Sequence, residues 1–155
     1  MSELENKATP AKPVKTGKNR RKSRELVLKG IYQHLVSNKE LRLIIRELAD
    51  DAEFDRADEA YFRQLIEGVY DNLAELDDRL KGFIDRPIGE LSPIEHAILC
   101  LSAYELIHDA TIPYRVAINE GVELAKIYGG TDGHKYVNGV LDKLAIEARP
   151  NEARR

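Results

Sequence analysis

The chain has 155 residues, of which 43% are hydrophobic and 33% are charged, and this composition predicts one soluble globular domain. No apolar run approaches the roughly 20 residues that cross a bilayer, and no apolar segment follows the basic N-terminus, which argues against a membrane span and a secretory signal. The single cysteine, Cys100, excludes an internal disulfide and favours a reducing, cytoplasmic location.

Charge is divided unevenly along the chain. Residues 1–24 hold eight Lys or Arg against two acidic residues, a net charge of +6, whereas the remainder carries −9 and brings the whole chain to −3. A basic N-terminal segment on an acidic domain favours a polyanionic partner that binds at one edge of the molecule. The simpler alternative is that the basic segment is only a solvated tail. The basic excess peaks just before the first helical pattern, at Lys18, Arg20, Arg21, Lys22 and Arg24.

Helical spacing of apolar residues dominates the rest of the chain. Residues 1–19 have almost no large apolar side chain, so we expect a disordered basic extension there. From Ser23 onward apolar residues recur every three or four positions, and no segment alternates as a strand would. The expected helices cover about 23–37, 39–49, 59–73, 76–84, 93–107, 113–128 and 134–147.

Three helix boundaries carry local signals. Asp58 can cap the third helix, and Ser92-Pro93-Ile94-Glu95 is a capping box with proline at the first helical position. Gly129-Gly130 predicts a left-handed stop. The predicted fold is therefore all-α, with one domain at 20–150 and a C-terminal tail at 151–155.

Residues that could carry chemistry are scattered. No two of the four histidines have the helical spacing of a zinc site, and Cys100 offers no second thiolate, so we expect neither a metal site nor a catalytic cysteine. The glycine-rich segment 129–135 does not match a phosphate-binding loop. It does place free amides, Lys135 and Tyr136 at the start of the last helix, where an RNA phosphate and base could bind. No nucleophile or base converges with the acidic residues, so we expect no catalysis.

Four segments carry a family resemblance. They are RRKSRELVLKGIYQHL at 20–35, YFRQLIEGVYDN at 61–72, LSPIEHAILCLSAYELIHDATIPYRVAINEGVELAKIYG at 91–129 and DGHKYVNGVLDKLA at 132–145. Together they resemble the NusB family of bacterial transcription antitermination factors, most specifically in the last two segments. The resemblance implies about seven helices in two packed helical bundles, no cofactor and no enzymatic activity.

The resemblance also implies a function. Members bind the boxA element of nascent rRNA transcripts together with the small-subunit ribosomal protein NusE, and with RNA polymerase and other Nus factors they promote read-through at rRNA operons. The implied NusE contacts are Tyr32 and Glu95, and a homodimer stays open because the family contains both monomers and dimers. With Lys18 added from the charge pattern, the expected RNA contacts are Arg20, Arg21, Lys22, Arg24, Phe83, Arg86, Lys135, Tyr136 and Asn138.

Two alternatives remain open beside this function. One is a helical module that binds only protein, and the other is a detached accessory domain of an rRNA methyltransferase, which shares the fold. The RNA-binding hypothesis requires a specific geometry: the arginines that lead into the first helix and Tyr136 at the start of the last must lie close enough to hold one RNA strand.

Overall fold

The computed structural model describes residues 17–153, with side chains from Arg20 onward, and in that range it contains helices and no strand. The extension expected at 1–19 therefore lies mostly outside the described residues, as does the Lys18 side chain. The first helix begins at Gly17, earlier than the predicted start at Ser23. The helices are α2 Gly17–Ser37, α3 Leu41–Ala49, α4 Glu59–Asp71, α5 Leu73–Leu80, α6 Pro93–His108, α7 Tyr114–Tyr128, α8 Gly133–Ala148 and α9 Pro150–Ala153, with short 3₁₀ turns at Phe54–Arg56 and Ile88–Glu90.

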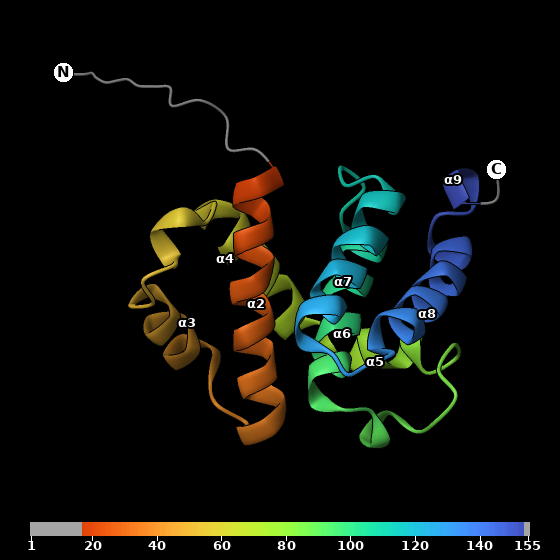
Figure 1. Cartoon of the computed structure of the whole chain (residues 1–155), viewed down its shortest axis with the longest axis horizontal. Coiled ribbons are helices and arrows are strands. Elements are labelled where there is room, and N and C mark those ends of the chain that lie inside the picture. The colour runs from red at the N-terminus through yellow and green to blue at the C-terminus, as the bar shows by residue number, and fades with distance from the viewer. Residues whose placement is uncertain (1–16, 154–155) are drawn as a thin grey trace.

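The helices form two packed groups around α6. Helices α3 and α4 pack against α2 on one side of the molecule, and α7 and α8 pack together on the other (Figure 1). Helix α6 contacts α2, α4, α5, α7 and α8, and every residue from Ala97 to Ala103 is buried. A helix that is apolar on all sides belongs inside a domain, which explains its central place. The arrangement confirms the predicted all-α fold in two helical bundles.

Two predicted caps are confirmed. The Asp58 carboxylate accepts a hydrogen bond from the Tyr61 amide at 3.1 Å, and the Ser92 hydroxyl accepts one from the Glu95 amide at 3.2 Å. Each cap satisfies a backbone donor that has no partner within its helix.

Three further predicted boundaries are wrong. The helix expected over 59–73 is divided at Asn72, which ends α4 and precedes α5. Helix α5 ends at Leu80, several residues before Pro87. The predicted left-handed stop is also incorrect, because Gly129 has φ of −84° and the chain leaves α7 in an extended conformation.

Gly30 allows α2 to approach α3 and α4 closely. A Cβ atom there would lie 2.8 Å from side-chain atoms of both Ile44 and Ile66, which are fully buried. In Gly30→Ala, overpacking is therefore expected to lower the free energy of unfolding by about 1–3 kcal/mol. The higher helix propensity of alanine offsets up to about 1 kcal/mol of this loss.

Gly139 in α8 provides the matched control, since a Cβ atom there meets nothing within 4 Å. Gly139→Ala is expected to stabilise the protein by up to about 1 kcal/mol. Urea unfolding of both variants measures the difference, and a Gly30→Ala protein as stable as Gly139→Ala would contradict the close packing of α2.

Candidate nucleic-acid interface

Tyr136 lies in the first turn of α8 and faces the segment that follows α5. Its hydroxyl donates to the Asp85 carboxylate at 3.1 Å and accepts from the Asp85 amide at 3.4 Å. The Arg86 guanidinium lies over the tyrosine ring, 4.7 Å from its centroid. We call Phe83, Asp85, Arg86, Lys135 and Tyr136 the Tyr136 site.

Two surface hollows flank the Tyr136 ring. One has a volume of about 330 Å³ and is lined by Arg86, Glu95, Tyr136 and the turn 130–133. The other, of about 270 Å³, is lined by Phe83, Asp85, Lys135, Tyr136, Gly139, Val140 and Lys143. The structure thus brings four predicted RNA contacts, Phe83, Arg86, Lys135 and Tyr136, together from two separate segments of the chain.

Carboxylates partly neutralise the cations of this site. Arg86 donates two hydrogen bonds to Asp85, at 2.7 and 3.2 Å. These hydrogen bonds are the main cause that lowers the pKa of the Asp85 carboxyl. Lys135 lies 3.6 Å from Asp132, and both of these side chains are about three-quarters exposed. Exposed ion pairs contribute only about 0–1 kcal/mol, so a phosphate can displace the carboxylates at small cost.

Asn138 is not part of the Tyr136 site. It follows Tyr136 by two residues, which is about 200° around a helix, and buried Val137 lies between them. Its side chain is exposed but lies on a different face of α8.

Glu95, a predicted partner contact, borders the same region. A Cβ atom at Gly133 would lie 2.6 Å from the Glu95 carboxylate, so a larger residue there would displace the carboxylate. The carboxylate therefore lies against the N-terminal end of α8, where negative charge is favourable. Burial also raises the pKa of the nearby Tyr136 hydroxyl above its ordinary value.

The predicted basic grip at the start of α2 divides into buried and exposed parts. Arg24 is only 2% exposed; its Nε donates to a Glu105 carboxylate oxygen at 2.8 Å, and the Tyr61 hydroxyl donates to the same oxygen. Glu105 is completely buried. This enclosed network joins α2, α4 and α6, so Arg24 has a structural role and is not placed to contact RNA.

The other α2 cations lie nearer the surface and are also paired. Arg21 is half exposed and donates two hydrogen bonds to Glu120, at 3.0 and 2.8 Å. Arg20 lies 4.2 Å from the centroid of the Tyr61 ring. Lys22 Nζ lies 2.9 and 3.0 Å from carboxylate oxygens of Glu25 and Glu53.

The two basic regions lie at opposite ends of α6. Arg24 pairs with Glu105 near the C-terminus of this helix, whereas Gly133 meets Glu95 in its first turn. Ten residues of helix separate the two contacts, or about 15 Å along the axis. In Figure 1 the start of α2 lies at the top, and α8 begins in the lower half. The α2 arginines and Tyr136 therefore do not approach each other closely, contrary to the expectation. Only a strand of several nucleotides could contact both regions.

Two neighbours of Tyr136 were missed by the sequence analysis. Asp85 anchors the tyrosine hydroxyl, and Lys143 lines the second hollow. Lys143 follows Tyr136 by seven residues, a spacing that returns to the same helix face and could have indicated it.

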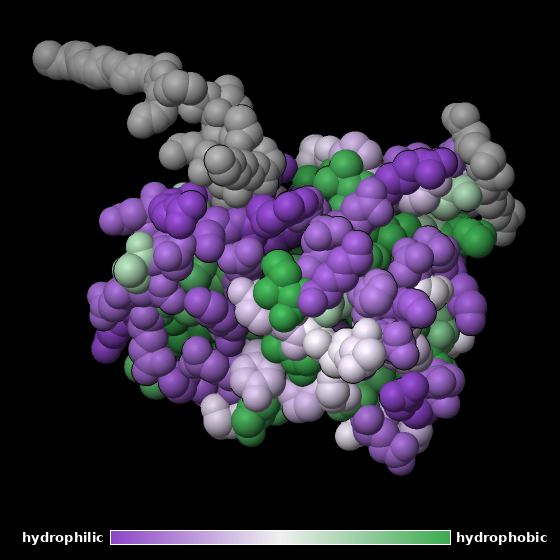
Figure 2. All heavy atoms as spheres, viewed as in Figure 1, coloured by the Kyte–Doolittle hydropathy of each residue, from purple (hydrophilic) through white to green (hydrophobic). Residues whose placement is uncertain are grey.

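Tyr32, the other predicted partner contact, is 38% exposed on α2. Further large apolar side chains are exposed on the same helix and on α7, namely Val36, Ile127 and Tyr128. Helix α2 is linked to α7 by the Arg21–Glu120 ion pair, and Figure 2 shows hydrophobic residues in several places on a largely hydrophilic face. We call these four residues the α2–α7 apolar surface.

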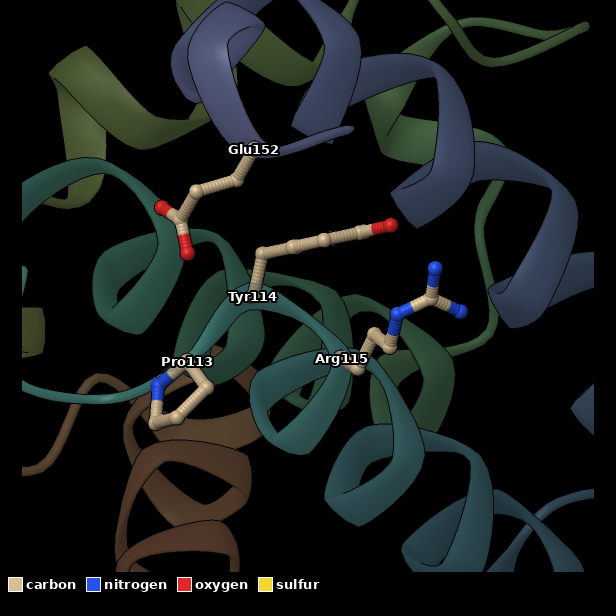
Figure 3. A pocket seen from close by; sticks show the side chains of 4 residues that line it. All are labelled: Pro113, Tyr114, Arg115 and Glu152. Atoms are coloured by element: carbon tan, nitrogen blue, oxygen red, sulfur yellow. The ribbon is translucent and has the colours of Figure 1, made fainter. Parts of the chain in front are cut away.

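A third hollow, of about 330 Å³, lies where α7 begins beside α9 and is lined by Pro113, Tyr114, Arg115 and Glu152. Figure 3 shows Tyr114 and Arg115 extending the same way from α7, with Glu152 reaching over from α9. It contains none of the predicted site residues. Within residues 17–153, no helix has both the length and the apolarity to cross a membrane.

Comparison with known proteins gives consistent matches. The NusB family profile matches residues 21–146. A transcription antitermination protein NusB from Methylobacillus flagellatus is 71% identical over 149 residues, which cover 96% of this chain and 97% of that protein. A protein of the same name from Thiobacillus denitrificans is 52% identical over 134 residues, covering 86% of this chain and 92% of that one.

Solved structures agree with the sequence matches. The T. maritima NusB structure has a TM-score of 0.76 and 33% identity, and covers 87% of this chain and 96% of that one. A complex of the antitermination factors NusB and NusE with double-stranded RNA contains a chain of the same fold, with a TM-score of 0.75 and 21% identity over 83% of this chain and 97% of that one. The named relatives are transcription antitermination proteins. The chain belongs to the NusB family.

Proposed function

We propose that the protein is a cytoplasmic transcription antitermination factor that binds boxA RNA in nascent rRNA transcripts and acts with NusE to promote read-through by RNA polymerase. The observation that carries this proposal is the Tyr136 site, where an aromatic ring and a lysine of α8 share one hollowed surface with a guanidinium group from the segment after α5. Family membership supports the proposal.

The Tyr136 site has the chemistry that single-stranded RNA requires. Unpaired bases stack on aromatic rings and on guanidinium planes, and Tyr136 and Arg86 offer both within 4.7 Å. Lys135 and Lys143 line the second hollow, where they can neutralise phosphates of the same strand. Stacking and base contacts would give selectivity, and the lysines would give affinity.

The exposed cations of α2 would extend this contact electrostatically. Arg21 would exchange its bond to Glu120 for a phosphate, an exchange of one charged partner for another with little net cost. Because the two regions lie about 15 Å apart along α6, the RNA would run between them rather than bind at one point.

Arg21→Ala is expected to lower the slope of log affinity against log salt concentration by about 0.7, the value for one lost phosphate contact on a single strand. Arg63→Ala is the matched control, because Arg63 is similarly exposed (46% against 50%) and also paired, with Glu59 at 3.3 Å. RNA titrations at several salt concentrations measure both slopes. Equal slopes for Arg21→Ala and the unmodified protein would place α2 outside the RNA contact.

A partner protein would use the α2–α7 apolar surface and Glu95. All four side chains are more than one-third exposed, and apolar and aromatic residues commonly form the centre of an interface. The solved complex of NusB, NusE and RNA, which contains a chain of this fold, supports NusE as the occupant. Contacts with RNA polymerase and other Nus factors, and a homodimer through this surface, are further parts of the proposal.

Tyr32→Ala is expected to weaken NusE binding about tenfold or more, since tyrosines at interface centres often dominate affinity. Isothermal titration with purified NusE measures the change, and Tyr114→Ala controls for loss of a half-buried tyrosine elsewhere. Light scattering of the chain alone and with NusE separates self-association from partner binding. Unchanged affinity in Tyr32→Ala would remove this surface from the proposal.

Gel shifts with boxA RNA and a scrambled RNA of equal composition test the function as a whole. Preference for boxA supports it. Absence of RNA binding, with NusE binding retained, would favour the module that binds only protein. Stimulation of a separate rRNA methyltransferase chain would favour the accessory-domain alternative.

A further inference from the structure

Helices α5 and α6 bring three metal-ligating side chains together outside the Tyr136 site. The Asp77 carboxylate oxygen lies 2.7 Å from His96 Nε2 and 3.5 Å from Cys100 Sγ, and the three donor atoms all lie within 4.8 Å of one another. His96 and Cys100 are four residues apart and so share one face of α6. Within residues 17–153 this is the one group of three or more such ligands.

We propose that Asp77, His96 and Cys100 form a binding site for a zinc-class transition-metal ion. Thiolate, imidazole and carboxylate are the three ligand types that zinc accepts in proteins. Zinc bonds of about 2.0–2.1 Å to nitrogen or oxygen and about 2.3 Å to sulfur place tetrahedral ligands about 3.3–3.7 Å apart. The 3.5 Å between Asp77 and Cys100 already fits, His96 and Asp77 need to separate by less than about 1 Å, and His96 and Cys100, within 4.8 Å, need to approach by at most about 1 Å.

Charge and access also suit such an ion. One thiolate and one carboxylate offset the charge of a divalent ion, with a neutral imidazole as the third ligand, so the filled site is neutral in a largely buried position. Binding would release the Cys100 thiol proton to water. The Asp77 side chain is 31% exposed, against 12% for His96, so an ion and a water as fourth ligand would enter on the Asp77 side.

The ion would link the two ends of the segment between α5 and α6. Residues 78–95 connect the first ligand to the other two, and this segment carries Phe83, Asp85 and Arg86. A bridge between Asp77 and His96 would fix the ends of the segment that presents Arg86 to Tyr136. This consequence for RNA rests on the proposed function, whereas metal binding itself does not.

Titration of the full chain with Co²⁺ tests the site. One Co²⁺ per chain is expected, with the near-ultraviolet charge-transfer band of a cobalt–thiolate bond and displacement of that band by Zn²⁺. Cys100→Ser should remove the band, and His96→Gln, which keeps a donor to Asp77, should weaken Zn²⁺ binding roughly tenfold or more. Zn²⁺ at about 100-fold over its Kd should raise Tm by roughly 5–10 °C.

His108 gives the matched control. It pairs with Glu75 at 2.9 Å across the same two helices, but it has no cysteine beside it. His108→Gln should leave the cobalt band and the Zn²⁺ affinity unchanged. The site is overturned if no thiolate band appears, or if Cys100→Ser or His96→Gln binds the ion as the unmodified protein does. If the unmodified protein shows the cobalt band but does not bind RNA, the proposed function is overturned and the metal site is still supported.

Discussion

Arg24→Ala is expected to lower the free energy of unfolding by about 3–5 kcal/mol, because it leaves the Glu105 carboxylate buried without its cation. The side chains of Arg24 and Glu105 are 3% and 1% exposed, so solvent cannot replace the lost partner. Thermal unfolding should show Tm reduced by roughly 10 °C.

An exposed pair on the same helix is the control. Arg21→Ala breaks two hydrogen bonds to Glu120, but Arg21 is half exposed, and the expected loss is only about 0–1 kcal/mol. Replacing the whole buried network by apolar residues, as Arg24→Met with Glu105→Leu and Tyr61→Phe, should restore most of the stability. Similar losses for Arg24→Ala and Arg21→Ala would refute the structural role of Arg24.

The loss in Arg24→Ala should also depend on pH. Burial already raises the pKa of the Glu105 carboxyl above its ordinary value of 4.5, and removal of Arg24 takes away the cation that opposes this rise. The folded variant then binds a proton more tightly than the unfolded chain, so its stability is greatest at low pH and declines as pH rises through the folded-state pKa. The deficit of the variant should therefore shrink as pH falls from neutrality toward 4.5.

Tyr136→Ala is expected to weaken boxA RNA binding by roughly tenfold or more, since stacking of one base contributes about 1–3 kcal/mol. The same change removes the ring beneath Arg86 and the hydroxyl bonded to Asp85. Fluorescence anisotropy with a labelled single-stranded boxA RNA measures the affinity.

Two variants separate stacking from other effects. Tyr136→Phe keeps the ring and should retain most of the affinity, although it loses the bond to Asp85. Tyr114→Ala removes a tyrosine at the third hollow, between α7 and α9, and should leave RNA affinity unchanged. Equal affinities of Tyr136→Ala and the unmodified protein would move the base-stacking site elsewhere.

The sequence predicted those parts of the fold that depend on local chemistry. The caps at Asp58 and Ser92 need only a side-chain oxygen and a nearby amide, and both are present. The break at Asn72 was not predicted, because apolar spacing continues through it. Gly129 was misassigned because a glycine permits a left-handed conformation but does not require one.

The candidate site was predictable to a smaller extent. Phe83 and Arg86 were joined to Tyr136 by family resemblance alone, because contacts across 50 residues leave no periodic signal. Arg24 was predicted to contact RNA, although it shares a helix face with buried Leu28 and Ile31, at four and seven residues along. Its partner Glu105 lies 81 residues away, a pairing that only the folded chain makes visible.

An NMR titration of the isotopically labelled chain with single-stranded boxA RNA tests the central claim most directly, because it reports every contacted residue at once. At 17.6 kDa the protein is small enough for residue-by-residue amide spectroscopy. The largest changes should occur at residues 83–86 and 133–143, with smaller ones at 20–22 and none at α3. Changes confined to other surfaces, with the signals of Arg86 and Tyr136 unmoved at saturating RNA, would contradict the account.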